Sequence, residues 1–196
     1  MPFIWIFLQE PKDCINMCKI LKEISGLSAD ELLKKYNISS TPPIDLKNLL
    51  ERIGVSSYPY DFSKVEKLAG YEPNTIIGAA ISTEDNLDIM YAKNMSENRV
   101  RFTIAHELAH CCLHSDNLKI KHIELRLDKD ASPREMNANI FAGELLIPQK
   151  SLNAIYDKLY VPTLSVLSEI FKVSTNVMRA RLGHLKMSFV DDSYAD

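Results

Sequence analysis

The sequence predicts an α+β fold, in which a small antiparallel sheet is joined to a mostly helical C-terminal part. Three observations indicate this class. Apolar residues recur at helical spacing before residue 55, apolar and β-branched runs cluster between residues 76 and 92, and helical spacing returns from Ser96 onward. Because helices come before the strands and dominate after them, the two kinds of element are segregated along the chain, as in α+β proteins.

Three short helices are expected before the sheet, over residues 12–24, 28–36 and 44–54. The second has a clear start, because Ser28 and Glu31 have the spacing of a capping box, in which each side chain binds the other residue's backbone N–H. Pro42 and Pro43 break the chain before the third helix. That helix should end at Gly54, since glycine readily adopts the left-handed conformation that often follows a helix.

The sheet is expected as a hairpin of residues 76–82 (IIGAAIS) and 87–92 (LDIMYA), which are rich in strand-forming residues. Residues 83–86 (TEDN) have the chemistry of a turn between them. The remainder is predicted to be helical at about residues 97–113, 133–146, 149–159, 163–171 and 174–185.

Composition excludes several classes of protein. A 196-residue chain with a net charge of −3 suggests one globular domain, with no reason to bind nucleic acid or membranes through overall charge. Its four cysteines do not form the pattern of a secreted disulfide framework, which indicates a reducing cytoplasm. The opening MPFIWIFLQE lacks the basic start of a signal peptide and the roughly 20 apolar residues of a membrane helix. We therefore expect a cytoplasmic protein.

Residues 101–114, RFTIAHELAHCCLH, contain the motif HExxH. Residues four apart on an α-helix are separated by about 400° of rotation and about 6 Å along the axis, so His106 and His110 face the same side. Two imidazoles in this relation can hold one Zn²⁺ at about 2.0–2.1 Å. Glu107 lies about 100° further round, where it can accept a proton without ligating the metal. So short a motif also occurs by chance, but burying these side chains among apolar neighbours is costly without a partner such as a metal.

A catalytic zinc site of this kind needs a third protein ligand. His114 continues the four-residue spacing, but it lies about 12 Å along the axis from His106, so a straight helix cannot bring all three histidines to one ion. His122 is a second candidate, in a segment that the sequence does not place.

The third candidate, Glu135, lies in the predicted helix 133–146 and shares a face with Asn139. Its carboxylate could complete the site, while Asn139 could accept the second N–H of a ligand histidine. However, Ser132 and Glu135 also have capping-box spacing, and a capping glutamate would point back to the start of its own helix. Glu144 is the fallback ligand.

These stretches together resemble the ImmA/IrrE-type family of HExxH zinc metallopeptidases. The family's pattern is similar to RFTxAHExxHxxLH followed by ExxANxFAxxLLxP, which here are RFTIAHELAHCCLH at 101–114 and EMNANIFAGELLIP at 135–148. Weaker similarity extends over residues 28–185. Ala109 and Asn137 stand where the family often has glycine and glutamate.

The resemblance implies a zincin-like metallopeptidase domain that holds one Zn²⁺ per chain. It implies His106, His110 and Glu135 as zinc ligands and Glu107 as the general base. Family members are similar to proteases that cleave helix-turn-helix repressors of mobile elements or stress genes, often encoded beside them. A repressor is therefore the expected protein substrate.

The residue that stabilises the oxyanion is left open by the sequence, whereas an edge strand beside the cleft is expected from the zincin-like fold. Tyr91, Arg101 and His122 are the candidates for stabilising the oxyanion that develops during hydrolysis, and the sequence does not choose among them. The hairpin is expected to supply an edge strand beside the cleft, to which an extended substrate could add by backbone hydrogen bonds.

The expected organisation is an N-terminal extension (1–27), a zincin-like domain (28–148), a helical segment packed on it (149–187) and an acidic tail without fixed structure (188–196). Residues 163–185 are spaced like a helix-turn-helix, and residues 149–187 contain six basic and two acidic side chains. Direct DNA binding through this segment is therefore open, although packing on the zinc domain is the favoured interpretation. The alternative to a protease is a non-proteolytic regulatory module that binds metal and a repressor or DNA.

Overall fold

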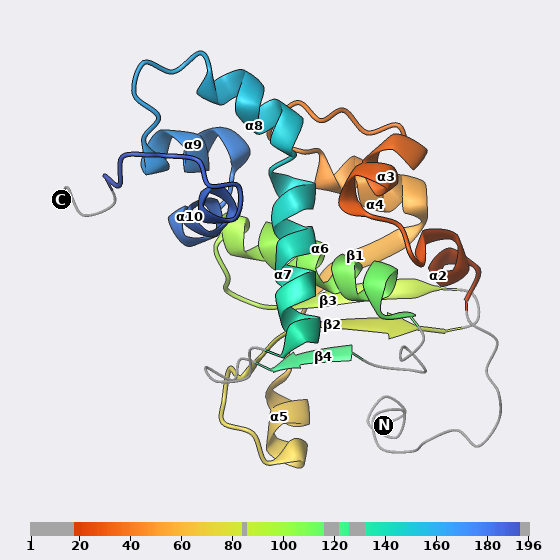
Figure 1. Ribbon diagram of the computed structural model, residues 1–196. Helices are drawn as coiled ribbons and strands as arrows, with labels where there is room; N and C mark the ends of the chain where they lie inside the picture. Colours follow the sequence, from red (N-terminus) through yellow and green to blue (C-terminus); the bar gives the residue numbers. More distant parts are fainter. Residues whose placement is uncertain (1–17, 84–85, 116–121, 126–131, 193–196) are drawn as a thin grey trace.

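The computed structural model describes residues 18–83, 86–115, 122–125 and 132–192, and it combines one sheet with helices on both of its faces (Figure 1). The strands are β1 Val55–Tyr60, β2 Ile76–Ser82, β3 Leu87–Ala92 and β4 His122–Leu125. The helices are α2 Lys19–Ile24, α3 Ala29–Lys35, α4 Leu46–Ile53, α5 Ser63–Ala69, α6 Glu97–Leu113, α7 Pro133–Leu146, α8 Gln149–Tyr156, α9 Leu164–Phe171 and α10 Thr175–His184. The predicted α+β class is confirmed.

Within the described residues the sheet has four strands, in the order β1-β3-β2-β4. The predicted hairpin is confirmed, with β2 antiparallel to β3 and Ala80 opposite Ile89. The sheet is nevertheless mixed rather than purely antiparallel, because β1 pairs with β3 in parallel. β1 was not predicted: it contains Pro59 and is mostly exposed, features that suit a strand at the edge of a sheet and weaken its sequence signal.

The strand order also corrects the expected position of the hairpin. Both of its strands are internal, since β1 covers one side of β3 and β4 pairs with the other side of β2. The sheet edges are therefore β1 and β4, so an extended substrate could not add to the hairpin itself.

Each face of the sheet has its own apolar cluster. Ala80, Leu87 and Ile89 face the main core, which they share with α2, α3, α4, α6, α7, α9 and α10. Ala79 and Met90 point the other way, into a small cluster beneath α5. This alternation follows from the two-residue period of a strand. In Figure 1, α5 accordingly lies on the opposite side of the sheet from α3 and α4.

The helices begin and end largely where capping chemistry predicts. The Ser28 side chain accepts from the Glu31 backbone N–H and the Glu31 carboxylate accepts from the Ser28 backbone N–H, which confirms the capping box of α3. Gly54 ends α4 in the left-handed conformation, with φ of 88°. Of the predicted helix 12–24, the structure contains α2, and the earlier residues lie outside the described part.

The C-terminal helices pack on the rest of the molecule, as Leu167, Phe171 and Met178 belong to the main core. The expectation of a tail without fixed structure is wrong for residues 188–192. Val190 forms a β-bridge with Thr163, and Asp192 accepts from the backbone N–H of Ser165. These contacts hold the chain against the start of α9, and residues 193–196 lie outside the described part.

Candidate metal centre

Helix α6 crosses the middle of the molecule, between the sheet and α7 (Figure 1). Every residue from Thr103 to Cys112 is buried, so the helix is covered on all sides rather than on one stripe. His106, Glu107 and His110 are each at most 1% exposed. The motif therefore lies inside the protein, in surroundings that strengthen electrostatic interactions.

Three donor side chains, here called the donor triangle, converge beside α6. His106 Nε2 lies 2.9 Å from His110 Nε2 and 3.1 Å from Glu135 Oε2, and His110 Nε2 lies 3.4 Å from Glu135 Oε1. A tetrahedral Zn²⁺ with ligands at about 2.0–2.1 Å separates those ligand atoms by roughly 3.3 Å from one another. The donor atoms of the three side chains are thus spaced closely enough for one zinc ion to bind them.

The hydrogen bond behind His106 shows which of its ring nitrogens faces the other donors. Asn139 Oδ1 lies 2.9 Å from His106 Nδ1, and because an amide oxygen only accepts, Nδ1 must carry the hydrogen. In a neutral ring Nε2 then has a lone pair directed at the Glu135 carboxylate and His110. Such groups repel unless a proton or a cation lies among them, so the donor set fits a metal ion.

His114, which the sequence left as a possible third ligand, lies behind His110 instead. Its Nδ1 is 3.2 Å from His110 Nδ1, the ring nitrogen that faces away from the donor triangle. Burial lowers the pKa of His114, with a smaller effect from nearby Arg134, and this favours the neutral ring. A neutral His114 can accept the Nδ1–H of His110 and so fix its orientation.

Glu135 has contacts that bear on both of the roles that the sequence left open. Its backbone N–H donates to Ser132 Oγ at 3.2 Å, which is the Ser132 half of a capping box. Its side chain does not complete the box, because both carboxylate oxygens lie against the two histidines. The start of α7 is therefore capped by serine, while the carboxylate lies against His106 and His110.

Glu107 lies close to the sheet, beside Gly78 of β2. An alanine Cβ at Gly78, in β2, would lie 2.7 Å from Glu107 Oε1 and 2.6 Å from Thr103 Cγ2. Only glycine leaves room for α6 to approach the strand this closely. Gly78 was not singled out in the sequence, although a glycine inside a strand is a recognised sign of close backbone approach.

Of the other candidates for the site, Glu144 and Arg101 are bound to other groups, and Tyr91 and His122 remain untested. Glu144, the fallback ligand, bonds instead to Arg181 at 3.2 Å. Arg101 is bound to the carbonyl oxygens of Ile44 and Lys172, so its guanidinium is committed to holding α6 in place. Tyr91 packs, half-buried, against the main core. The side chain of His122 lies outside the described part of the structure.

The helix-turn-helix-like segment has its basic side chains largely engaged within the protein. Arg181 is buried and donates to Ile147 O and Glu144. Arg179 forms an ion pair with Asp191 at 2.8 Å, and Lys172 pairs with Glu169. A DNA-binding helix would present such residues to phosphates and bases, so this arrangement favours packing over DNA recognition.

Comparisons with known proteins agree with this geometry. The family model Peptidase_M78, described as the IrrE N-terminal-like domain, matches residues 72–183, more than half of the 196-residue chain. The matched region contains the hairpin, the HExxH helix α6 and α7 with Glu135. No curated protein matches the chain significantly. Within the described ranges, no helix combines the length and apolar character needed to cross a membrane.

Proposed function

The chain belongs to the Peptidase_M78 family of IrrE N-terminal-like domains, and from this premise we propose that it is a zinc-dependent endopeptidase that cleaves a protein substrate at a specific site. The observation that carries the proposal is the donor triangle, in which the two Nε2 atoms are 2.9 Å apart and the Glu135 oxygens lie 3.1 Å from His106 and 3.4 Å from His110. His106, His110 and Glu135 would hold the ion. When bound, Zn²⁺ would supply Lewis acidity toward the scissile carbonyl and toward water.

Glu107 is the general base of this proposal. It follows His106 directly on α6, so it lies about 100° from the ligand face and reaches the site without belonging to the triangle. It would take the proton of the attacking water and pass it to the leaving amine. The close approach of β2 supports this role, because the backbone at Gly78 limits how far the carboxylate can move toward the strand.

The proposed substrate is an extended segment of a helix-turn-helix repressor, the substrate class that the family resemblance implies. The end of the sheet at β4 is the better candidate for docking, since the hairpin strands are paired on both sides. An extended chain could add to β4 by backbone hydrogen bonds. The engaged basic residues of α9 and α10 favour this protein substrate over direct DNA binding.

The test compares wild type with Glu107→Gln on the repressor encoded nearest to the gene. Glutamine keeps the size of the side chain but cannot accept the proton, so the cleavage rate should fall on the order of 10²–10⁴-fold while zinc content is unchanged. Glu51→Gln, an exposed change on α4, is the control for loss of one negative charge. Fragments are followed by gel and mass spectrometry.

Two outcomes would contradict the proposal. Cleavage that survives in Glu107→Gln would indicate a contaminating protease or another mechanism. If wild type never cleaves, yet wild type and Glu107→Gln bind the repressor equally and relieve repression, the chain is a regulatory module and not a protease.

A further inference from the structure

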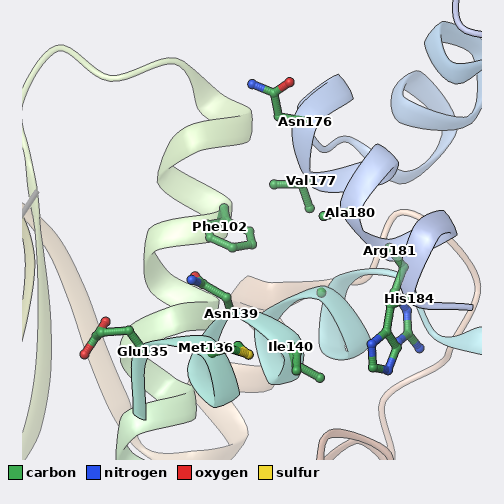
Figure 2. A pocket seen from close by; sticks show the side chains of 11 residues that line it. Phe102, Glu135, Met136, Asn139, Ile140, Asn176, Val177, Ala180, Arg181 and His184 are labelled. Atoms are coloured by element: carbon green, nitrogen blue, oxygen red, sulfur yellow. The ribbon is translucent and has the colours of Figure 1, made fainter. Parts of the chain in front are cut away.

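A cavity of about 460 Å³ lies between α7 and α10, directly beside the donor triangle (Figure 2). Its size falls within the range of roughly 300–1,000 Å³ that ligand pockets usually have. In Figure 2, Met136 and Ile140 of α7 form one wall and Val177 and Ala180 of α10 lie opposite them. Phe102 of α6 lies between the two walls.

The cavity and the metal centre share residues. Glu135, whose carboxylate lies against both histidines, and Asn139, which holds His106, both line the cavity. Phe102 precedes His106 by one helical turn, and their ring centroids are 6.3 Å apart. A peptide whose scissile bond lay at the donor triangle would therefore have a neighbouring side chain within reach of the cavity.

The lining selects for apolar groups. Five of the lining side chains are apolar: Phe102, Met136, Ile140, Val177 and Ala180. Two basic side chains, Arg181 and His184, also line the cavity, and Arg181 is buried and already donates to Ile147 O and Glu144. An acidic side chain would therefore find no uncommitted guanidinium there. An apolar side chain would move from water onto an apolar surface, which is favourable.

We infer that this cavity is a specificity pocket, which accepts a large apolar side chain such as leucine next to the scissile bond. The inference deepens the proposed function and names the residue type that the substrate must offer. It also gives the helix-turn-helix-like segment a role, because α10 supplies the wall formed by Val177 and Ala180. The segment would then shape substrate choice by packing on α7 rather than by binding DNA.

The first arm of the test measures binding without catalysis. N-acetyl-leucinamide and N-acetyl-asparaginamide have side chains of nearly the same size and shape, but only the first is apolar. Each is titrated into the full chain while methyl NMR signals of Met136, Ile140 and Val177 are observed. The leucine probe should shift these signals and bind at least about tenfold more tightly than the asparagine probe.

Two alanine-to-phenylalanine variants give a matched comparison. Ala180→Phe places a ring in the cavity from an exposed position of α10, and Ala154→Phe makes the same change on the exposed face of α8, outside the cavity. The leucine probe should lose at least about tenfold in affinity for Ala180→Phe and keep its affinity for Ala154→Phe. Equal binding of the two probes, or equal affinity for the two variants, would overturn the inference.

The second arm rests on the proposed protease activity and uses a pool of blocked synthetic decapeptides of random sequence. Mass spectrometry of the products should show leucine, methionine or phenylalanine enriched next to the cut, and this enrichment should be lost in Ala180→Phe. Cleavage without such enrichment would refute the pocket and leave the protease intact. Selective leucine binding without any cleavage would refute the protease and leave the pocket intact.

Discussion

Substituting Gly78 by alanine should show whether this glycine positions Glu107. The effect on the cleavage rate and the effect on stability can be measured separately. The added methyl group would lie 2.6 Å from Thr103 Cγ2 and 2.7 Å from Glu107 Oε1. Non-bonded carbon atoms prefer about 3.5–4.0 Å, so the neighbours would have to move by roughly 1 Å. Thr103 and Glu107 are 2% and 0% exposed, which leaves no open space for that movement.

The expected magnitudes follow from this overlap. Overpacking of a buried site typically destabilises a protein by about 1–3 kcal/mol. A displacement of about 1 Å in a catalytic group can reduce the rate on the order of 10²-fold. The zinc content should not change, because Gly78 faces Glu107 and not the donor triangle. The assay measures kcat and KM for repressor cleavage, zinc content and thermal unfolding of the same preparations.

A second substitution distinguishes the two contacts. Thr103→Ser removes the Cγ2 atom that overlaps most, so the double variant Gly78→Ala/Thr103→Ser should regain much of the lost stability while the rate stays low. Gly183→Ala is the control, since a methyl group there would meet no atom within 4 Å. A folded Gly78→Ala protein that keeps its full kcat would refute the conclusion that this contact positions Glu107.

The remaining predictions concern the ligand, its support, the cysteines and the cap of α3. Glu135→Gln should weaken zinc binding far more than it lowers the free energy of unfolding, because Ser132 still caps α7; calorimetry with zinc measures the first and denaturation of the metal-free protein the second. Asn139→Ala should reduce zinc affinity by about 10–100-fold, which is the usual cost of losing a partner behind a histidine ligand, and unchanged affinity would contradict the role given to its amide oxygen. Burial raises the pKa of Cys112 to about 12, so its thiol should stay protonated and resist iodoacetamide at pH 8 until the protein unfolds, as peptide mapping would show. Hydrogen bonds from Ser28 lower the pKa of Glu31. The stability that this carboxylate contributes is therefore present above its ordinary pKa and is lost as the pH falls through the lowered value. Ser28→Ala should reduce that acid dependence of the melting temperature.

The parts of the fold that the sequence predicted are those with strong local signals. Helices α6 and α7 run over Glu97–Leu113 and Pro133–Leu146, the ranges that periodicity and the flanking breaks indicated. The hairpin followed from two apolar runs around a turn, and its observed register confirms the pairing. In these segments local preference and tertiary packing favour the same structure.

Helix α5 and the strands β1 and β4 were not predicted, and the two strands depend on contacts between distant residues. β1 is mostly exposed and contains Pro59, and it becomes a strand by pairing with β3, more than 25 residues later. β4 likewise pairs with β2 across the whole of α6, at His122 opposite Ala80. Such pairing leaves little periodicity in a short segment, so pattern analysis of the sequence has no signal to detect.

The candidate site was predictable in its helix and ambiguous in its third donor. The spacing of His106 and His110 settled that both face one side, because helix geometry is local. Ser132 and Glu135, however, have a spacing that suits either a cap or a ligand, and only the packing of α7 on α6 directs the carboxylate to the histidines. The contact of His114 with His110 could not be read from spacing alone, because it depends on side-chain rotamers.

Zinc X-ray absorption spectroscopy on the purified protein tests the central claim most directly. The account predicts about one zinc per chain, bound by nitrogen and oxygen atoms at about 2.0–2.1 Å, and loss of that signal in His110→Ala. Cys111 and Cys112 lie on the same helix, which makes sulfur the informative alternative. Sulfur ligands at about 2.3 Å, or equal zinc content in wild type and His110→Ala, would contradict a site formed by His106, His110 and Glu135.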